Sequence, residues 1–319
     1  MMTMRDAHGG NGGMDIRQMQ YFLCLAQEGN VTRAARRLNI VQPALSMQIA
    51  KLEKSLGHKL FERAAQGMSL TPAGEKLRQI VDPILKDIDH AREAMAQLDG
   101  KVSGRVNIGM ITSAAQSTLP ASSATISARY PDIHLLVCEG YTETMLEWVA
   151  AGQLDIAVIN APNRRTGLTA QPILDEEMML ALGAAADLQL PKTVPFARLD
   201  GLDLVIPSRR HGLRRILDDA AAEAGFTLRP RLEIDTLSAI CEVVATTDLV
   251  TVLPGIALQA MLAAGRITAH RLKTPTVVRS VAFVTSPRRL VSSAMAAVMA
   301  VIAADLQAAA SSAARLARC

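Results

Sequence analysis

The stretch that decides the fold is V-T-R-A-A-R-R-L-N-I-V-Q-P-A-L-S-M-Q-I-A-K-L-E-K-S-L, residues 31–56, which predicts two helices joined by a short turn. Residues 32–38 are rich in Ala and Arg, which favour helix, and the β-branched pair at 40–41 interrupts it. Pro43 suits the first turn of a second helix. An apolar stripe follows at helical spacing, formed by Leu45, Ile49, Leu52 and Leu56. This is the geometry of a DNA-reading helix-turn-helix, expected at about residues 31–50.

The outer face of the second helix carries small and polar residues. Such residues suit a close approach to base edges, whereas Lys51 and Lys54 suit phosphates. An ordinary two-helix corner with a solvated face has the same pattern, so that alternative stays open at this point. The residues expected on or beside the outer face are Gln42, Pro43, Ala44, Ser46, Met47, Ala50, Lys51 and Lys54.

Two further patterns flank this pair of helices. Residues 15–27 read as an earlier helix. After the pair, Leu60-Phe61 and residues 68–71 predict a small hairpin, or wing, that turns at residues 65–67. Arg63 lies near the tip of the wing. It could enter a minor groove or touch phosphate, or it could simply be solvated.

A long helix is predicted at residues 72–99, with Thr71 as its cap and Pro72 at its first position. Its apolar residues recur at alternating steps of four and three, which is a heptad seam. A seam of this regularity favours a dimerising helix, and packing on its own domain is the alternative. The seam comprises Leu77, Val81, Ile84, Ile88, Ala91 and Met95.

The charge of the chain is concentrated in its first quarter. The 319 residues carry a net charge of +4. Residues 15–78 hold ten Lys and Arg against five acids, an excess of five positive charges, so the remainder carries −1. We therefore expect only this basic head, residues 15–78, to bind a polyanion.

The spacing of the cysteines and the lack of a long apolar run suggest a reduced, cytoplasmic protein without a metal site. The four cysteines, at 24, 138, 241 and 319, form no C-x-x-C pair and have no metal-ligand spacing. No apolar run reaches the roughly 20 residues that span a bilayer, so no membrane partner is expected. Residues 1–13 are polar and Gly-rich, and they are interpreted as a disordered leader.

Helical and strand patterns alternate from residue 104 to residue 310, after a Gly-containing linker. Alternation of this kind predicts an α/β domain with mainly parallel strands, and the number of elements predicts two sheets. The segments 161–167 and 273–276 are the expected crossovers. They divide the domain into subdomain I (residues 104–161 and 275–310) and subdomain II (residues 162–274).

Several motifs together resemble those of the LysR-type transcriptional regulators over residues 14–310. They are Q-P-A-L-S at 42–46, K-L-F-E-R at 59–63, L-T-P-A-G at 70–74 and G-Q-L-D-I-A-V at 152–158. The resemblance implies an N-terminal all-α winged helix-turn-helix at 14–71 and a linker helix. It further implies a C-terminal α/β domain of two Rossmann-like subdomains, similar to periplasmic binding proteins.

The resemblance also implies partners and site residues. The partners are promoter DNA, a small-molecule effector, a homodimer or dimer of dimers, and potentially RNA polymerase. Met47 departs from the family, where a long polar residue is commoner; a methionine can pack on a thymine methyl but cannot bond a guanine edge. Carried onto this sequence, the DNA-reading positions are Arg33, Gln42, Pro43, Ala44, Ser46, Met47 and Arg63.

The effector is expected at strand ends and helix starts, where open α/β sheets bind ligands and helix N-termini attract anions. Hydroxyl groups together with one arginine suit a small organic anion. Helix caps and a surface arginine are the plainer alternative. The expected effector-binding residues are Thr112, Ser113, Thr142, Asn160, Ser208 and Arg209.

Other classes of function find little support. The sequence contains no H-E-x-x-H, G-x-S-x-G, Walker-type or strand-linked G-x-G-x-x-G motif, and its six histidines are scattered. We therefore expect no enzyme, no catalytic residues and no cofactor. A stand-alone solute-binding protein would need export, for which no signal is present. A redox-sensing regulator of the same family is the remaining alternative, although Cys241 stands alone in subdomain II and Cys138 belongs to subdomain I.

Overall fold

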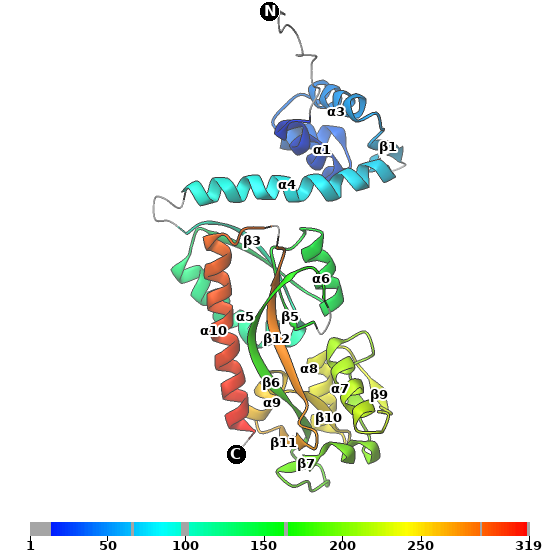
Figure 1. Ribbon diagram of the computed structural model, residues 1–319, viewed down its shortest axis with the longest axis vertical. Coiled ribbons are helices and arrows are strands. Elements are labelled where there is room, and N and C mark those ends of the chain that lie inside the picture. Colours follow the sequence, from blue (N-terminus) through cyan, green and yellow to red (C-terminus); the bar gives the residue numbers. More distant parts are fainter. Residues whose placement is uncertain (1–13, 65–66, 97–101, 163–164, 288, 318–319) are drawn as a thin grey trace, which may run out of the picture. The chain divides into compact units, whose positions relative to one another are not determined.

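The computed structural model describes residues 14–64, 67–96, 102–162, 165–287 and 289–317. It contains two compact units, Met1–Arg92 and Glu93–Cys319 (Figure 1). The expected leader at 1–13 and most of the expected wing turn lie outside the described residues.

The first unit is a winged helix-turn-helix. Its helices and strands are α1 (Ile16–Glu28), α2 (Val31–Arg37), α3 (Gln42–Leu56), β1 (Phe61–Ala64), β2 (Gly67–Leu70) and α4 (Pro72–Ala96). The two strands form an antiparallel hairpin in which Arg63 faces Met68. The elements begin within about two residues of where the sequence predicts them, which is the usual uncertainty of a helix end. The predicted end of the last helix, at residue 99, lies outside the described residues.

Short polar side chains set the starts of these helices. Asp15 accepts a hydrogen bond from the backbone N–H of Gln18 and forms a capping box before α1. Asn30 caps α2 in the same way, with 3.0 Å between its Oδ1 and the backbone nitrogen of Arg33. Thr71, the predicted cap of α4, accepts from the N–H of Gly74 at 3.1 Å. Of these caps the sequence predicts Thr71, whereas the other helices are predicted from the spacing of their apolar residues and from composition, and α3 starts without a side-chain cap.

The core of the first unit includes two residues of the predicted dimer seam on α4. Phe22 and Leu45 lie at its centre and are fully buried. Leu77 and Val81 join the same cluster, with 9% and 0% of their surface exposed. These two residues stabilise the fold of their own chain, so only the later part of the predicted seam is open to a partner.

The second unit is an α/β domain. Its first part contains β3 (Gly104–Met110), α5 (Thr112–Arg129), β4 (Ile133–Glu139), α6 (Thr142–Ala150), β5 (Ile156–Asn160) and β6 (Thr169–Gly183). Next come β7 (Thr193–Pro195), the 3-10 helix η2 (Phe196–Gly201), β8 (Val205–Ile206), α7 (Gly212–Glu223), β9 (Leu232–Glu233) and α8 (Leu237–Thr246). The last elements are β10 (Thr251–Pro254), α9 (Gly255–Ala263), β11 (Ile267–Lys273), β12 (Val278–Thr285) and α10 (Ser293–Leu316).

Two subdomains share these elements, and each has its own hydrophobic cluster. The strand order is β4-β3-β5-β12-β6-β11-β7, with β10 also paired to β6. Strand β3 is parallel to β4 and β5, whereas β12 is antiparallel to both β5 and β6. The prediction of mainly parallel strands is therefore wrong, because the strands that cross between the subdomains run against their neighbours.

The crossover at the start of subdomain II is a strand rather than a loop. Just beyond the predicted crossover at 161–167, β6 begins at Thr169 and runs for 15 residues. Its first part pairs with β12 and its last part with β10 and β11. The two predicted sheets are consequently joined by hydrogen-bonded strands, and Figure 1 shows β6 and β12 running side by side through the domain.

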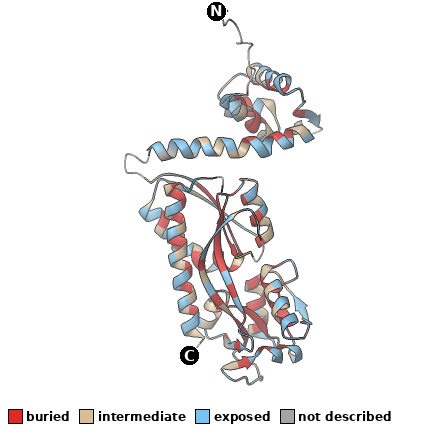
Figure 2. Ribbon diagram, viewed as in Figure 1, coloured by how far each residue is buried: buried red, intermediate tan, exposed pale blue. Residues whose placement is uncertain are grey.

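Helix α10 packs along the domain on α5, α9, β3 and β6. Among the described helices it is the one long and apolar enough to cross a membrane by length and composition. Figure 2 shows buried residues along this helix, among them Val298, Ile302 and Leu306. Its Asp305 also accepts a hydrogen bond from Ser122 of α5 at 2.6 Å. These contacts are those of a core helix on an α/β sheet.

Candidate DNA-reading helix and effector site

Helix α3 separates a buried face from an exposed one. Leu45, Ile49 and Leu52 are buried against α1 and α2. The predicted DNA-reading residues lie on the other side, where Ala44 is half-buried and Gln42, Pro43, Ser46 and Met47 are exposed. The side chains of Gln42 and Ser46 are 3.3 Å apart and share a hydrogen bond. The structure thus places these five residues together on one accessible surface.

The remaining predicted DNA-reading residues, Arg33 and Arg63, lie on neighbouring elements. Arg33 is exposed on α2, and its Nε lies 3.5 Å from a carboxylate oxygen of Glu28. Its guanidinium also donates to the backbone carbonyl of Glu28. These contacts restrain the arginine at the corner between α1 and α2. Arg63 is exposed on the first strand of the wing.

A buried glutamate, which no sequence motif predicts, holds the wing on α3. Glu53 accepts hydrogen bonds from the Lys59 side chain at 2.7 Å and from the Leu60 N–H at 2.9 Å. Burial raises the pKa of Glu53, but these hydrogen bonds and the Lys59 charge outweigh it, so the net pKa lies below its usual value. The glutamate is therefore ionised and holds the start of the wing on α3.

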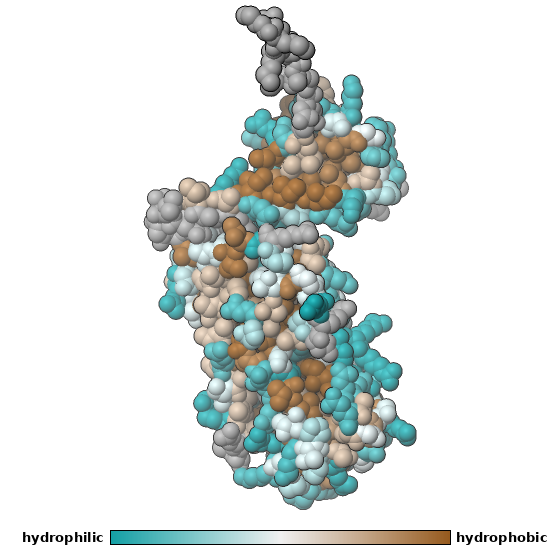
Figure 3. Space-filling model, in the orientation of Figure 1, coloured by the Kyte–Doolittle hydropathy of each residue, from teal (hydrophilic) through white to brown (hydrophobic). Residues whose placement is uncertain are grey.

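An exposed apolar stripe remains on α4. Ile80, Ile84 and Met95 have 48%, 36% and 67% of their surface exposed. Ile88 is half-buried and Ala91 is exposed. Figure 3 shows hydrophobic surface on the first unit alongside this helix. The later part of the predicted seam is thus accessible to a second chain.

Three of the predicted effector residues come from adjacent strand ends in subdomain I. Ser113 lies in the first turn of α5 after β3, Thr142 begins α6 after β4, and Asn160 ends β5. They are 2%, 2% and 4% exposed. Strands β4, β3 and β5 are neighbours and parallel, so their carboxyl ends lie at one edge of the sheet. Thr112, the first residue of α5, is half-buried at the same edge.

Thr142 and Asn160 are buried without a polar partner. Among the described residues, neither the Thr142 Oγ1 nor the Oδ1 and Nδ2 atoms of Asn160 have a hydrogen bond. The first residue of α7 in subdomain II, Gly212, closes over them. A Cβ atom at Gly212 would lie 2.8 Å from the Asn160 Nδ2 and 3.3 Å from the Thr142 Oγ1. Glycine therefore permits the two subdomains to meet here.

Further contacts extend this meeting point into what we call the junction cluster: Tyr141, Thr142, Asn160, His211, Gly212 and Asp235. The Tyr141 hydroxyl donates to the Asp235 carboxylate at 3.0 Å, and the Tyr141 and His211 rings meet edge to face at 5.7 Å.

Burial, together with the Arg279 charge and despite the opposing effect of Asp235, lowers the pKa of His211 to about 4. The histidine is therefore neutral at pH 7, and its Nδ1 accepts the N–H of Leu213.

A buried ion pair lies behind Ser113. Arg279 of β12 is fully buried, donates to the Ser113 Oγ at 2.8 Å and pairs with Glu176 of β6 at 2.7 Å. The other Glu176 oxygen accepts the N–H of Ile256 at 2.7 Å. The sequence prediction missed both charged residues, since they lie 103 positions apart and belong to no motif.

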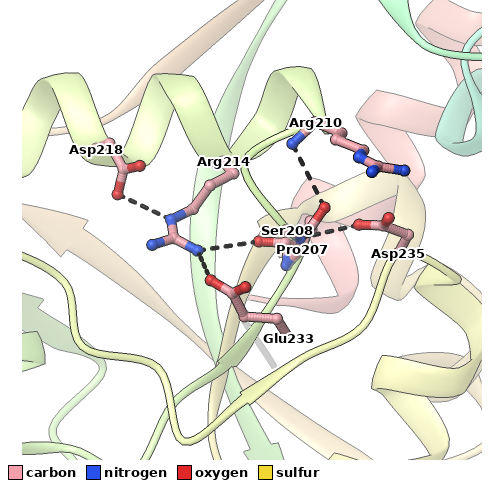
Figure 4. Close-up of polar contacts among 7 residues, drawn as sticks. All are labelled: Pro207, Ser208, Arg210, Arg214, Asp218, Glu233 and Asp235. Carbon is pink, nitrogen blue, oxygen red and sulfur yellow. Dashed lines mark hydrogen bonds and ion pairs between the residues drawn. The ribbon is translucent and has the colours of Figure 1, made fainter.

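Ser208 and Arg209, the last two predicted effector residues, follow β8 in subdomain II. The backbone N–H of Ser208 donates to Asp235 at 2.9 Å (Figure 4). Arg209 is exposed and lines an open hollow of about 530 Å³ with Arg210 and Arg214. Figure 4 shows Arg214 held by Asp218, Glu233 and the carbonyl of Pro207. The structure therefore brings four of the six predicted residues to one edge, with Ser208 linked to it through Asp235.

The described cysteines are poorly suited to redox chemistry. Cys24, Cys138 and Cys241 are free thiols, and Cys319 lies outside the described residues. Burial, with a smaller effect of Glu242, raises the pKa of Cys241 to about 11. Burial also raises the pKa values of Cys138 and Cys24. Since the thiolate is the reactive form, none of the three is activated.

Known proteins with related sequences are transcriptional regulators. The hydrogen peroxide-inducible genes activator of Haemophilus influenzae is 27% identical over 244 residues, covering 76% of this chain and 81% of that protein. The nitrogen assimilation regulatory protein nac of Escherichia coli is 29% identical over 266 residues, covering 83% of this chain and 86% of that protein.

A similar fold occurs in full-length CbnR, solved as a complex with its target DNA. The match covers 92% of this chain and 100% of that chain, with a TM-score of 0.63 and 20% identity. The pattern of bacterial regulatory helix-turn-helix proteins of the lysR family matches residues 16–75, and that of the LysR substrate binding domain matches residues 99–307. The chain therefore belongs to the LysR family of DNA-binding transcriptional regulators.

Proposed function

We propose that this regulator reads promoter DNA with α3 and the wing, and that a small organic anion bound at the junction cluster alters its DNA contacts. The observation that carries the effector proposal is the burial of Thr142 and Asn160 without polar partners. An unpaired buried polar group is costly, so such groups tend to be present where a ligand satisfies them.

The ends of two helices support an anion as the effector. Helices α5 and α6 begin after Ile111 and Tyr141, neither of which caps its helix with a side-chain hydrogen bond. The first N–H groups of both helices are thus open to another acceptor, and the helix dipole favours negative charge there. The hydroxyl of Ser113, backed by Arg279, adds a polar group at the same edge.

The DNA-binding proposal is supported by the exposed face of α3, the accessible Arg63 and the positive charge of the head. We further propose that the later part of α4 joins two chains, as a homodimer or within a dimer of dimers, and that the protein acts in the cytoplasm without catalysis. Contact with RNA polymerase would follow from binding at a promoter.

The DNA-reading residues can be tested with duplexes selected from a random library by the full chain. We expect Ser46→Ala and Arg33→Ala each to weaken binding about tenfold, as the loss of one groove or phosphate contact does. Both residues are exposed, so the thermal unfolding temperature should not change. Unchanged affinity of both variants in a footprinting titration would reject the assignment of this face to DNA.

The effector proposal can be tested by thermal-shift screening against a panel of small carboxylates. A carboxylate that binds should raise the unfolding temperature of the natural chain and fail to do so in Thr142→Val, which has the same shape but no hydroxyl. Thr118→Val is the control, because Thr118 is a buried threonine of α5 that is already bonded to the carbonyl of Ala114. An equal shift in Thr142→Val would place the ligand elsewhere.

Redox sensing is the second candidate function, favoured by the peroxide-responsive relative. The raised thiol pKa values argue against it. We therefore expect peroxide treatment to leave DNA affinity unchanged. A peroxide-dependent change in affinity that Cys241→Ala abolishes would favour the redox function instead.

A further inference from the structure

Two large apolar side chains are strongly exposed on the DNA-reading helix. Val41 and Met47 have 70% and 67% of their surface exposed. Among residues 14–64 and 67–70, before α4, they are the two most exposed large apolar side chains. Pro43 is exposed on the same helix, one turn before Met47. We call Val41, Pro43 and Met47 the apolar reading face.

The folding of this chain does not account for the apolar reading face. The core of the unit is filled from the opposite side of α3 by Leu45, Ile49 and Leu52. A single exposed apolar residue is common, but two on a short helical segment favour a partner that covers them. Lys51 and Lys54 are exposed farther along α3, so this partner is expected to be polyanionic.

A DNA major groove offers one apolar group, the 5-methyl group of thymine. The thioether of Met47 has no hydrogen-bond donor, so it cannot select a guanine edge. One donor of the neighbouring Gln42 amide is held by the Ser46 hydroxyl. At Met47 itself, an apolar contact is therefore the chemistry that the side chain can supply, beside the polar groups of Gln42 and Ser46.

We propose that Met47 reads the methyl group of a thymine, with Val41 and Pro43 extending the apolar contact. At this position of α3, the site preference of the protein then depends on a methyl group and not on a hydrogen bond. The inference rests on the proposed DNA-reading role of α3 and names the base feature that it selects.

The test uses the full chain and duplexes selected from a random library. Each thymine of the enriched site is replaced in turn by deoxyuridine, which pairs identically but lacks the methyl group. We expect at least one replacement in each half-site to weaken binding about fourfold, the effect of losing one buried methyl group. Met47→Leu should keep this dependence, and Met47→Gln should bind thymine and deoxyuridine duplexes equally.

The outcomes separate this inference from the proposed function. Enrichment of a defined sequence with no sensitive thymine would overturn the methyl reading and leave DNA recognition intact. Sensitivity that persists in Met47→Gln would overturn the role of Met47. Failure to enrich any sequence would overturn the proposed DNA-reading role and this inference with it.

Discussion

Helix α3 and the junction cluster depart from the usual pattern of burial in opposite directions. At the start of the helix Val41 and Met47 lie in solvent, and the junction buries the side chains of Thr142 and Asn160, whose polar atoms have no hydrogen bond among the described residues. Both arrangements cost free energy in the isolated chain. The two arrangements differ in the partner that they suit. An open apolar face suits a large surface such as a DNA groove. Enclosed polar atoms suit a small molecule that the protein surrounds.

The largest effect in this comparison should come from the ion pair behind the junction. Glu176→Met leaves the fully buried Arg279 without its carboxylate. We expect the free energy of unfolding of the second unit to fall by about 3–5 kcal/mol. The fluorescence of Trp148, the sole tryptophan of the chain, reports on this unit during urea unfolding.

The matched control for the ion pair is the double variant Glu176→Met/Arg279→Met. It buries no unpaired charge and should recover most of the lost stability. If the double variant is as unstable as Glu176→Met, the buried unpaired charge is not the cause of the lost stability. The ion pair would then not be what stabilises the domain behind the unpaired groups of the junction.

The junction should also make stability depend on pH through His211. Its pKa is about 4 in the folded chain against 6.5 for an ordinary histidine, so the unfolded chain binds the proton more readily between these values. Stability should fall as the pH decreases through this window, by up to about 3 kcal/mol. The measurement is urea unfolding of the natural chain and of His211→Asn from about pH 7 to about pH 4.5.

His211→Asn can still accept the N–H of Leu213 but cannot titrate. It should lose less stability over the same range, since the nearby Asp235 has a lowered pKa and takes up a proton only below that pKa. Parallel pH dependence of the two proteins would show that His211 is not held neutral by its surroundings.

The apolar stripe on α4 sharpens the comparison, because its proposed partner is a second chain. Ile84→Lys combined with Ile88→Lys should weaken dimerisation about 100-fold, since charges in an apolar seam resist losing water. Gln79→Lys is the control, as it adds a charge at an exposed position off the stripe. Sedimentation that detects the same mass for all three proteins would move the interface away from this stripe.

The smallest effect should come from removing one unpaired hydroxyl at the junction. Thr142→Val should raise the free energy of unfolding by about 1 kcal/mol in the absence of effector, because it removes an unsatisfied buried group. Thr118→Val should lower it or leave it unchanged, since that hydroxyl is bonded. A destabilised Thr142→Val would mean that its hydroxyl already has a partner, such as an ordered water.

Local signals explain why the first unit was predicted closely. Thr71 was predicted as a cap from its place before Pro72, and the apolar spacing of Leu45, Ile49 and Leu52 predicted α3, so a short window of sequence contains the relevant signals. The apolar stripe on α4 was found in the same way. The sequence did not show which of the apolar residues of α4 join the core, because Leu77 and Val81 are buried by helices far away in the chain.

Long-range pairing explains what the sequence prediction missed in the second unit. The first half of β6 contains Gln171, Pro172 and two acids, which obscures the alternation typical of a strand. Glu176 becomes recognisable as part of the effector region only when β12 places Arg279 beside it. Ser113, Thr142 and Asn160 could be expected at one edge of the sheet because the fold class alone sets that edge; their binding of an effector stays a prediction.

The pairing of β6 with β12 has a mechanical consequence. Because the two strands that cross between the subdomains are hydrogen-bonded to each other, the connection is a ribbon and not a pair of free hinges. Rotating one subdomain against the other must twist that ribbon, and its ladder supplies the restoring torque. Arg279 and Glu176 face each other across it, and Arg279 also holds Ser113. A ligand that displaces Ser113 would therefore act, through Arg279, on the two strands that resist this twisting.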